Sequence, residues 1–306
     1  MKSPRNKTID IGVEEGAEFL KRVLRPGIKE ELPEDIRDLT ILGDSTELKK
    51  KLPEGFADLI IADTPYNLDK DFNGESFRKL SDDDYEEYTE GWVKLTKRLL
   101  KDNGTIYVCC DWRSGNAVYK VLKRHFKIRN RITWQREKGR GARGNWKSCL
   151  EDIWFATAGD NYKFNLDAVK VRRRVIAPYR TEGKPRDWEE TKEGNFRNTH
   201  PSNFWDDISV PYWSMPENTA HPTQKPEKLL AKLILASSDP GDMVFDPFLG
   251  SGTTSVTAKK LGRHYLGIEQ NERYCVWAEK RLAMAESDKT IQGYRDGIFW
   301  ERNSGK

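Results

Sequence analysis

Cysteine and histidine are scarce in this sequence, which has four of each among 306 residues. Cys109 and Cys110 are adjacent, while Cys149 and Cys275 stand alone. No Cys-x-x-Cys pair or Cys/His cluster therefore has the spacing of a zinc site, and four cysteines are too few for a disulfide scaffold. We expect a protein of a reducing compartment that holds no metal.

Long hydrophobic runs are also missing. The longest, such as residues 229–236, fall far short of the ~18 residues that cross a bilayer, and Lys232 interrupts that run. Residues 1–12 lack the apolar core of a signal peptide, and no internal repeat indicates a solenoid. We therefore expect neither a membrane span nor a membrane partner.

Neither sign of charge is in large excess. Lys and Arg number 53 and Asp and Glu 49, so the net charge is +4 and any surface that binds nucleic acid must be local. Aromatic residues are plentiful, with 10 Trp, 11 Tyr and 12 Phe, which excludes a disordered chain. At about 150 residues per domain, the length allows one large or two modest domains.

Short apolar segments typical of buried strands alternate with segments of helical periodicity. The expected strands are 39–42, 57–62, 105–110, 128–135, 152–158, 243–246 and 265–268. The expected helices are 13–24, 46–52, 82–100, 118–126, 226–237, 252–261 and 272–285. This alternation predicts an α/β fold with a mostly parallel sheet. Residues 136–148 form a basic, glycine-rich loop, and residues 159–220 are too long for an ordinary connection, which predicts an inserted substrate-reading region.

The segment VFDPFLGSGTT predicts a strand that ends at Asp246 and runs through glycines into a helix. Gly250 and Gly252 allow a tight turn and close approach of a ligand, and Glu269 follows at the end of the next strand, where a carboxylate can hold ribose hydroxyls. A P-loop is absent, and Ser255 breaks the Gly-x-Gly-x-x-Gly spacing. The motif predicts a nucleoside cofactor without phosphates, although a plain packing turn explains the glycines equally well.

A second motif, Asp63-Thr64-Pro65-Tyr66, follows a buried strand. Open α/β sheets bind ligands at this end of their strands. Pro65 restricts Thr64 to an extended conformation, so the Thr64 carbonyl and the Asp63 carboxylate could together accept both hydrogens of an amino group. Tyr66 could stack on a flat ring. Taken alone, the motif is also compatible with an ordinary turn after a strand.

Together, and with His221-Pro-Thr-Gln-Lys-Pro226 and Gly43-Asp44, these motifs make the sequence resemble the amino-group DNA methyltransferases of the β arrangement, in which the catalytic motif precedes the cofactor motif. The resemblance covers about residues 39–283. It implies a Rossmann-like, S-adenosylmethionine-dependent methyltransferase fold with a mostly parallel sheet and an inserted target-recognition region. It also implies a relation to restriction-modification systems.

The resemblance divides the chain into four parts. Residues 1–38 are an N-terminal extension, and residues 39–158 are the catalytic half of the methyltransferase domain. Residues 159–220 are the target-recognition region, and residues 221–306 are the cofactor-binding half of the same domain.

Family members transfer the methyl group of S-adenosylmethionine to N6 of adenine or N4 of cytosine, after the target base leaves the stack of the duplex. The resemblance implies that Asp63, Thr64, Pro65 and Tyr66 form the catalytic tetrad and that no metal is needed. The family usually has proline where this sequence has Thr64. Because the role at that position belongs to a backbone carbonyl, we expect the site to be active.

The resemblance also implies a cofactor site. Asp44 is expected near the adenine of the cofactor, Glu269 at its ribose, and Thr223 and Lys225 near its methionine end, although Lys225 could instead solvate the start of a helix. The full set of expected cofactor contacts is Asp44, Thr223, Lys225, Asp246, Phe248, Gly250, Gly252 and Glu269.

The expected DNA-binding surface is a local concentration of positive charge. Residues 113–147 contain 12 basic residues and one acidic residue, whereas the whole chain carries only +4. Such a stretch suits contacts to phosphates, although many charge runs are only solvated surfaces. The candidate DNA contacts are Arg136, Lys138, Arg140, Arg143 and Lys147, with Arg172, Arg173 and Arg174 in the inserted region.

The target base stays open between two choices. Within the family, Asp at the first tetrad position favours adenine and Ser favours cytosine, so Asp63 favours adenine-N6 methylation over cytosine-N4 methylation. A methyltransferase that acts on RNA and an inactive nucleic-acid-binding protein are further alternatives. The expected partner is double-stranded DNA, with a homodimer left open, and the expected location is the cytoplasm, associated with the nucleoid in a prokaryote.

Overall fold

The structure of the chain is a computed structural model. It describes residues 3–27, 30–48, 50–72, 75–142, 144–175 and 179–302. None of the helices within these ranges combines the length and the apolar character needed to cross a bilayer.

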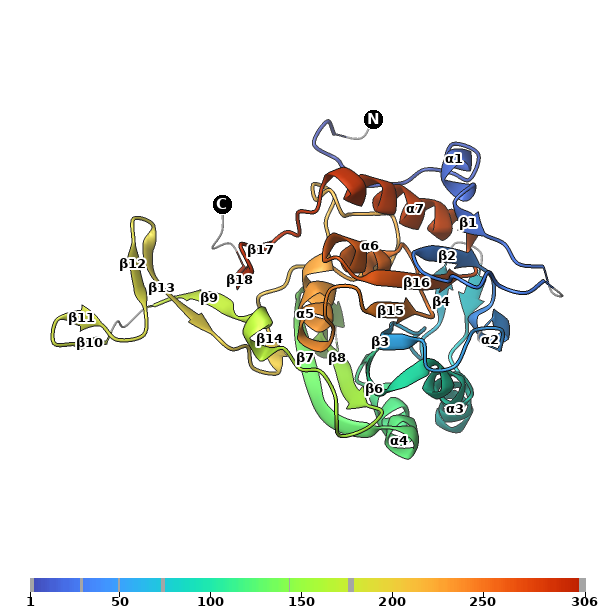
Figure 1. The fold of residues 1–306 in the computed structure, drawn as a ribbon, viewed down its shortest axis with the longest axis horizontal. Helices are drawn as coiled ribbons and strands as arrows, with labels where there is room; N and C mark the ends of the chain where they lie inside the picture. Colours follow the sequence, from blue (N-terminus) through green and yellow to red (C-terminus); the bar gives the residue numbers. More distant parts are fainter. Residues whose placement is uncertain are drawn as a thin grey trace.

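A nine-stranded sheet forms the centre of the molecule (Figure 1). Its strands, in spatial order, are β1 (Val23–Leu24), β2 (Leu39–Leu42), β16 (His264–Glu269), β15 (Met243–Asp246), β3 (Ala57–Ala62), β6 (Leu100–Cys110), β8 (Asn145–Thr157), β7 (Lys127–Ala142) and β14 (Phe204–Trp205). Among these described strands, only β8 runs antiparallel to its neighbours. The expected mostly parallel sheet is therefore confirmed, and two strands from late in the chain lie between β2 and β3.

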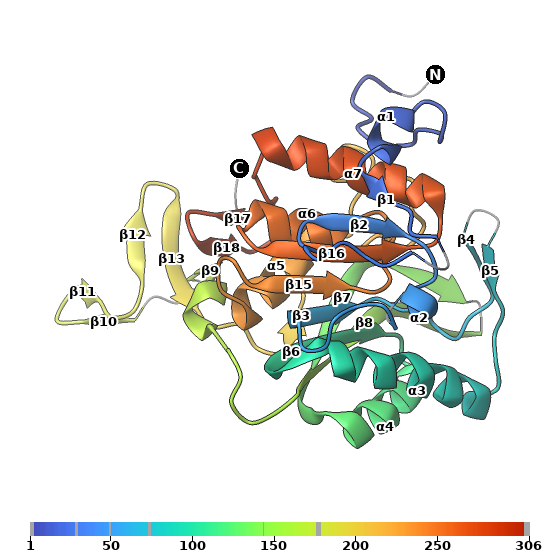
Figure 2. The same ribbon diagram turned by 45° about the vertical axis from the view of Figure 1, so that its right-hand side comes forward.

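Helices cover both faces of this sheet, as Figure 2 shows. One face packs on α3 (Asp82–Leu99) and α4 (Gly115–His125), and the other on α5 (Glu227–Ser237), α6 (Thr253–Lys260) and α7 (Glu272–Ser287). All six residues of β3 are buried, and all are apolar except Asp58, which pairs with Lys101 at 2.8 Å. Ile60 lies in the first core and Leu59 in the second, as the alternation of side chains along a strand requires.

The N-terminal segment differs from the expected helix over residues 13–24. Only α1 (Ala17–Leu20) is helical there, and the chain then enters β1, which pairs in parallel with β2. Gly16 lies so close to α7 that a Cβ atom on it would be 2.2 Å from Val276. Packing on α7 and pairing at the edge of the sheet therefore override the local helical pattern. The helix expected over residues 46–52 is also shorter, as α2 (Ser45–Leu48).

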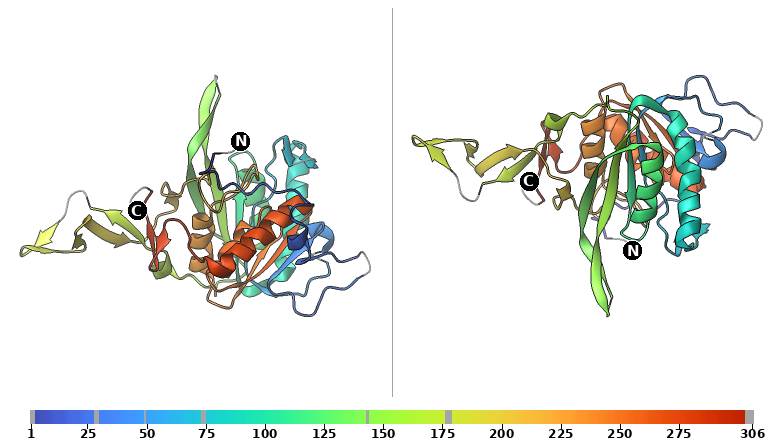
Figure 3. Two further views of the ribbon diagram at one scale, coloured as in Figure 1. Left: turned by 90° about the horizontal axis from the view of Figure 1, so that it is seen from above. Right: turned by 90° about the horizontal axis from the view of Figure 1, so that it is seen from below.

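The basic segment 136–148, expected as a loop, is a β-hairpin in its described part. Strands β7 and β8 pair from Lys127 opposite Thr157 to Ala142 opposite Asn145. Figure 3 shows the ribbon of this hairpin extending away from the body of the molecule. Its outer part has no apolar core to cover, so the sequence carries no alternation that would reveal the strands. Backbone hydrogen bonds between the two strands form the ribbon nevertheless.

A second, smaller sheet extends to the left of the body in Figure 1. Its strands, in spatial order, are β12 (Glu189–Thr191), β13 (Gly194–Thr199), β9 (Val171–Arg174), β18 (Ile298–Trp300) and β17 (Tyr294–Arg295). The hairpin of β10 (Arg180–Thr181) and β11 (Lys184–Pro185) lies beyond it, and a separate hairpin joins β4 (Lys70–Phe72) to β5 (Glu75–Phe77). The small sheet thus combines the inserted region with C-terminal strands that the sequence division assigns to the cofactor-binding half.

Apolar packing joins this small sheet to the body. The 3-10 helix η1 (Leu166–Val169) leads into β9, and Val171 packs in one cluster with Phe299 of β18 and with Ala231 and Leu235 of α5. Helix α5 therefore contacts the central sheet on one side and the small sheet on the other.

Candidate active site

Neighbouring parallel strands bring the two sequence motifs to one edge of the central sheet. In the pairing of β3 with β15, Leu59 is opposite Val244. Asp63, which follows β3, and Asp246, which ends β15, therefore reach the same edge, and Glu269 ends the next strand, β16. Asp63 and Asp246 therefore stand at the ends of neighbouring strands. Ligands of open α/β sheets bind at this edge.

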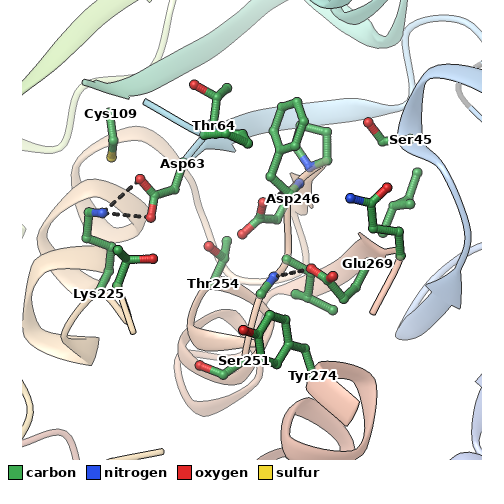
Figure 4. Close-up of a pocket in the computed structure, with 18 of the residues that line it drawn as sticks. Ser45, Asp63, Thr64, Cys109, Lys225, Asp246, Ser251, Thr254, Glu269 and Tyr274 are labelled. Atoms are coloured by element: carbon green, nitrogen blue, oxygen red, sulfur yellow. Dashed lines mark hydrogen bonds and ion pairs between the residues drawn. The ribbon is translucent and has the colours of Figure 1, made fainter. Parts of the chain in front are cut away.

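A cavity of about 350 Å³ opens where these strands end. This volume lies within the usual range of small-molecule sites, about 300–1,000 Å³. All four residues of the expected catalytic tetrad line it, and so do seven of the eight expected cofactor contacts, the exception being Gly252. Figure 4 shows side chains from both motifs directed toward this common space.

Gly252, the eighth expected cofactor contact, lies where two helices pack closely. It precedes α6 with a φ of 84°, and a Cβ atom on it would lie 2.6 Å from the Cβ of Ala278 in α7. The absence of a side chain here lets α6 and α7 approach each other, so Gly252 serves helix packing, and its expected contact with a cofactor stays a prediction. Gly250 does line the cavity, and a Cβ atom on it would lie 3.2 Å from the ring of His221.

The carboxylate of Glu269 is held by the backbone. Its two oxygens accept hydrogen bonds from the N–H groups of Gly250 and Asn271, each at 2.8 Å (Figure 4 shows the first). This orients the carboxylate at the wall of the cavity. Asp44 is held similarly, since its Oδ1 accepts from the Thr46 N–H at 2.6 Å, which caps α2. The capping bond gives Asp44 a structural role beside its position in the cavity wall.

Asp246 is a buried carboxyl, with 3 % of its surface exposed. Its Oδ1 accepts a hydrogen bond of 2.9 Å from the Phe248 N–H. Burial raises the pKa of Asp246 to about 7, and the nearby charge of Asp63 adds to this rise, while Thr254 and the Phe248 N–H oppose it. The group therefore changes its charge near neutral pH.

Asp63 forms a close ion pair inside the cavity. The Nζ of Lys225 donates to both of its oxygens, at 2.8 and 2.7 Å (Figure 4). Burial raises the pKa of Asp63, and Lys225 opposes that rise. On the backbone side, the hydroxyl of Tyr85 in α3 donates to the Pro65 carbonyl at 3.1 Å and so fixes the turn of the tetrad.

Lys225 therefore lies beside the expected catalytic tetrad, in the cavity that also holds most of the expected cofactor contacts, and its placement near the methionine end of a cofactor stays a prediction. The side chain of Lys225 is 8 % exposed, which excludes a solvated helix start. Besides Asp63, it contacts the Glu151 carboxylate at 3.3 Å and lies 5.3 Å from the centre of the Tyr66 ring. Burial opposes its charged form, but Asp63 and Glu151 outweigh burial and raise the pKa of Lys225.

Glu151 is a site residue that the sequence analysis missed. Its Oε2 lies 3.1 Å from the Tyr66 hydroxyl, which is also 3.2 Å from Asp63 and can donate to either acid. Its Oε1 pairs with Arg136 of β7 at 2.8 Å. Burial raises the pKa of Glu151, but Lys225 and Arg136 outweigh burial and leave it below its ordinary value. The strand expected from the sequence starts at residue 152. Starting it one residue earlier would have placed Glu151 on the same face as Ile153 and Phe155.

The expected DNA contacts are dispersed. Arg136 lies beside the cavity, while Lys147 lies on the exposed part of the β7–β8 hairpin next to Trp146, which is 93 % exposed. Lys138 and Arg140 belong to β7, and Arg143 lies outside the described residues.

The guanidinium of Arg172, expected to contact DNA, makes its contacts within the small sheet. It pairs with Glu189 at 2.9 Å and lies over the rings of Phe196 and Trp300. The side chain of Arg173 pairs with Glu301 at 3.4 Å, and the backbone N–H of Arg174 donates to the same acid. These contacts fasten the C-terminal strands to β9.

Known proteins share this arrangement. A family model described as DNA methylase, of the N6/N4 type, matches residues 57–280. The type II methyltransferase M.HpaI of Haemophilus parainfluenzae is 35% identical over 245 residues, which are 79% of this chain and 73% of that protein. The DNA adenine methyltransferase YhdJ of Escherichia coli (strain K12) is 35% identical over 252 residues, covering 80% of this chain and 82% of that protein.

A solved structure supports the fold. The M1.HpyAVI–SAM complex superposes with a TM-score of 0.54 and 23% sequence identity, and the match covers 79% of this chain and 98% of that chain. The family match spans both strand-end motifs and the strands that bring them to one cavity. The chain therefore belongs to the N6/N4 DNA methylase family.

Proposed function

We propose that this DNA methyltransferase uses S-adenosylmethionine to methylate N6 of adenine in double-stranded DNA. The observation that carries the proposal is the placement of Asp63 and Asp246 at one cavity, at the ends of neighbouring parallel strands. Asp at the first position of the tetrad favours adenine, and a similar protein, YhdJ, is described as a DNA adenine methyltransferase. The family model spans both N6 and N4 enzymes, so cytosine-N4 methylation is the second candidate.

The charges of the cavity fit a cationic nucleoside better than a nucleotide. Asp44, Asp63, Asp246 and Glu269 all line it, and Lys225 in the same wall is already paired with Asp63. Phosphates would meet these carboxylates as like charges. S-adenosylmethionine has hydroxyls, an ammonium group and a sulfonium, and when bound it supplies an electrophilic methyl group.

The residues of the cavity have distinct tasks in this proposal. Glu269, with both oxygens held in place by backbone N–H groups, would accept ribose hydroxyls. Phe248 and Gly250 line the space that the cofactor would fill, and Asp246 offers a carboxylate to its positive charge. Thr223, which lies beside His221, would contact the amino-acid portion.

Asp63 and the Thr64 carbonyl would accept the two N–H bonds of the target amine. Hydrogen bonding by these acceptors draws the nitrogen toward tetrahedral geometry and frees its lone pair. The carboxylate stabilises the positive charge that develops on nitrogen more strongly than it stabilises the neutral amine, which lowers the barrier. Tyr66 would stack on the displaced base.

We propose that the β7–β8 hairpin and the region 159–220, with strands β17 and β18, contact the duplex. Figure 3 shows that both extend beyond the body that holds the cavity. The hairpin carries most of the concentrated positive charge, which suits phosphate contacts, and the small sheet would contact base edges.

The test is to methylate plasmid DNA with the purified chain and S-adenosylmethionine, digest the product to nucleosides and identify them by mass spectrometry. We expect N6-methyladenine. N4-methylcytosine would replace the adenine proposal with the cytosine candidate, and no methylated nucleoside on any DNA would overturn both. Single-molecule sequencing of the same product would report the modified base with its surrounding sequence.

A further inference from the structure

We infer that Glu151 and Arg136 are positioning residues that connect the DNA-facing hairpin to Asp63, so that contact with a DNA phosphate releases Asp63 from Lys225. The inference rests on the proposed function, because it assigns Asp63 to the target amine. We call Asp63, Tyr66, Lys225, Glu151 and Arg136 the coupling cluster.

The fold places this cluster at the root of the hairpin. Along β8, Phe155 and Ile153 pack in the core that also contains Ile61, and two residues further on the same face carries Glu151. Along β7, Trp134 packs in the same core, and Arg136 follows two residues later. The inward face of both strands thus changes from apolar to charged at Glu151 and Arg136, next to the cavity-lining residues Tyr66 and Lys225, before the strands continue into the exposed ribbon.

Charges alternate through the cluster. Arg136 pairs with Glu151 at 2.8 Å, Glu151 contacts Lys225 at 3.3 Å, and Lys225 binds Asp63 at 2.7 Å. The Tyr66 hydroxyl lies between the two acids, 3.2 Å from Asp63 and 3.1 Å from Glu151. Glu151 is therefore the one member for which contacts to Arg136, Lys225 and Tyr66 are all found among the described residues.

While it is paired with Lys225, Asp63 is a weak hydrogen-bond acceptor for the target amine. Both of its oxygens accept from the Nζ of Lys225, so fewer acceptor positions remain for a target amine. A cation so close also opposes the positive charge that develops on the amine nitrogen. Asp63 would be a better acceptor if Lys225 moved toward Glu151.

Arg136 can control that movement. Its side chain is 29 % exposed, whereas the side chains of Glu151 and Lys225 are 9 % and 8 % exposed, so Arg136 is the cation that a phosphate can reach. A phosphate that takes Arg136 leaves Glu151 without one of its two cations. Glu151 then attracts Lys225 more strongly, and the bonds from Lys225 to Asp63 weaken. Binding of DNA to the hairpin would in this way free Asp63 to accept the target amine.

The experiment separates the DNA affinity from the rate at saturation. Glu151→Gln removes the charge that attracts Lys225, so we expect its single-turnover methylation rate at saturating DNA to fall roughly 100-fold, as misplacement of reacting groups does, with DNA affinity nearly unchanged. Arg136→Gln removes the restraint on Glu151, so we expect a near-normal rate at saturating DNA but a weaker affinity. Its salt slope of binding, measured without cofactor, should decrease by about 0.9. Arg136→Lys should restore much of the affinity.

The neighbouring ion pair on the same two strands provides matched controls. Arg131 lies 3.7 Å from Asp152 across β7 and β8, where Asp152 also accepts from the Thr133 hydroxyl, and neither residue belongs to the coupling cluster. Asp152→Asn and Arg131→Gln should leave the methylation rate at saturating DNA unchanged. This result would show that loss of an ion pair between these two strands does not by itself lower the rate. Thermal melting of every variant identifies loss of folding, and if Glu151→Gln does not fold, the Arg136 variants still test the inference.

Two results would overturn the inference. The first is an Arg136→Gln enzyme whose saturated rate falls as far as that of Glu151→Gln, which would make the cluster a structural support only. The second is a Glu151→Gln enzyme that behaves like Asp152→Asn. A wild-type chain that methylates no base would instead contradict the proposed function, so the two failures are distinguishable.

Discussion

At the scale of single residues, removing Asp63 still leaves Lys225 one acidic partner, Glu151, which it shares with Arg136. In Asp63→Ala, Lys225 keeps its contact with Glu151, so the variant should fold. We expect S-adenosylmethionine binding, measured by titration calorimetry, to stay close to wild type. Methyl transfer should fall by ~10²–10³ or more, because the missing carboxylate acts mainly on the charged transition state. Near wild-type turnover of Asp63→Ala on its cognate duplex would show that the tetrad is not the catalytic site.

The two glycines of the cofactor motif should respond differently to substitution. In Gly252→Ala, the new methyl group would meet Ala278, so we expect a loss of about 1–3 kcal/mol in the free energy of unfolding, visible as a lower melting temperature, with cofactor affinity of the folded protein retained. In Gly250→Val, the side chain would occupy the cavity wall beside His221, and cofactor affinity should fall. Equal losses of cofactor affinity in both variants would contradict this division.

Asp246 predicts a pH dependence of cofactor binding. Its pKa is raised to about 7, so the carboxyl is mostly protonated at pH 6 and mostly ionised at pH 8. If the ionised form attracts a cationic cofactor, affinity should increase as pH rises through 7, by up to about tenfold per pH unit below the pKa. Calorimetric titrations at pH 6, 7 and 8 measure this, with Asp246→Asn as the control that should be flat. If the wild-type affinity is constant across this pH range, the charge of Asp246 does not contribute to cofactor binding.

At the scale of elements, the basic hairpin predicts salt-dependent DNA binding. Replacing Lys138 and Arg140 with Gln should reduce the slope of log affinity against log salt by about 0.9 for each phosphate that the hairpin no longer binds. A matched double variant replaces Lys120 and Lys127, which pair with Glu86 and Asp160 away from the outer part of the hairpin, and should keep the slope. An unchanged slope in the hairpin variant would mean that the ribbon is only a solvated surface.

The sequence was informative wherever burial sets the pattern. The strand over residues 57–62 was predicted with its observed bounds because five of its six residues are apolar and all six are buried. The sequence failed where pairing or packing with distant segments decides the conformation. The outer part of the ribbon pairs with β8 at Arg140 and Ala142, while β18 pairs with β9 and β17 pairs with β18. The ion pairs of Lys225 could not be predicted for the same reason, since its partners, Asp63 and Glu151, are distant in sequence.

At the scale of the whole molecule, a buried charge cluster holds the small sheet to the body that carries the cavity. Asp207, which follows β14, pairs with Lys232 of α5 at 2.7 Å and with Lys228 at 2.8 Å. Lys228 also donates to the Trp300 carbonyl at the end of β18. Burial raises the pKa of Asp207, but the two lysines outweigh burial and hold it below its ordinary value. One acid thus ties the C-terminal strands, β14 and α5 together.

Asp207→Asn should therefore weaken the attachment of the small sheet. It leaves two lysines without their counter-charge, which typically costs about 3–5 kcal/mol, and this should appear as a lower melting temperature and as faster hydrogen exchange in residues 294–300. Because Asp207 does not line the cavity, cofactor affinity of the folded protein should change little, while DNA affinity and selectivity for the recognition sequence should decrease together. The matched control is Asp187→Asn, which removes an exposed pair with Arg197 in the same region and should alter neither exchange nor melting. If Asp207→Asn loses cofactor binding as strongly as DNA binding, the two parts of the molecule are not separable, and the small sheet supports the cavity itself.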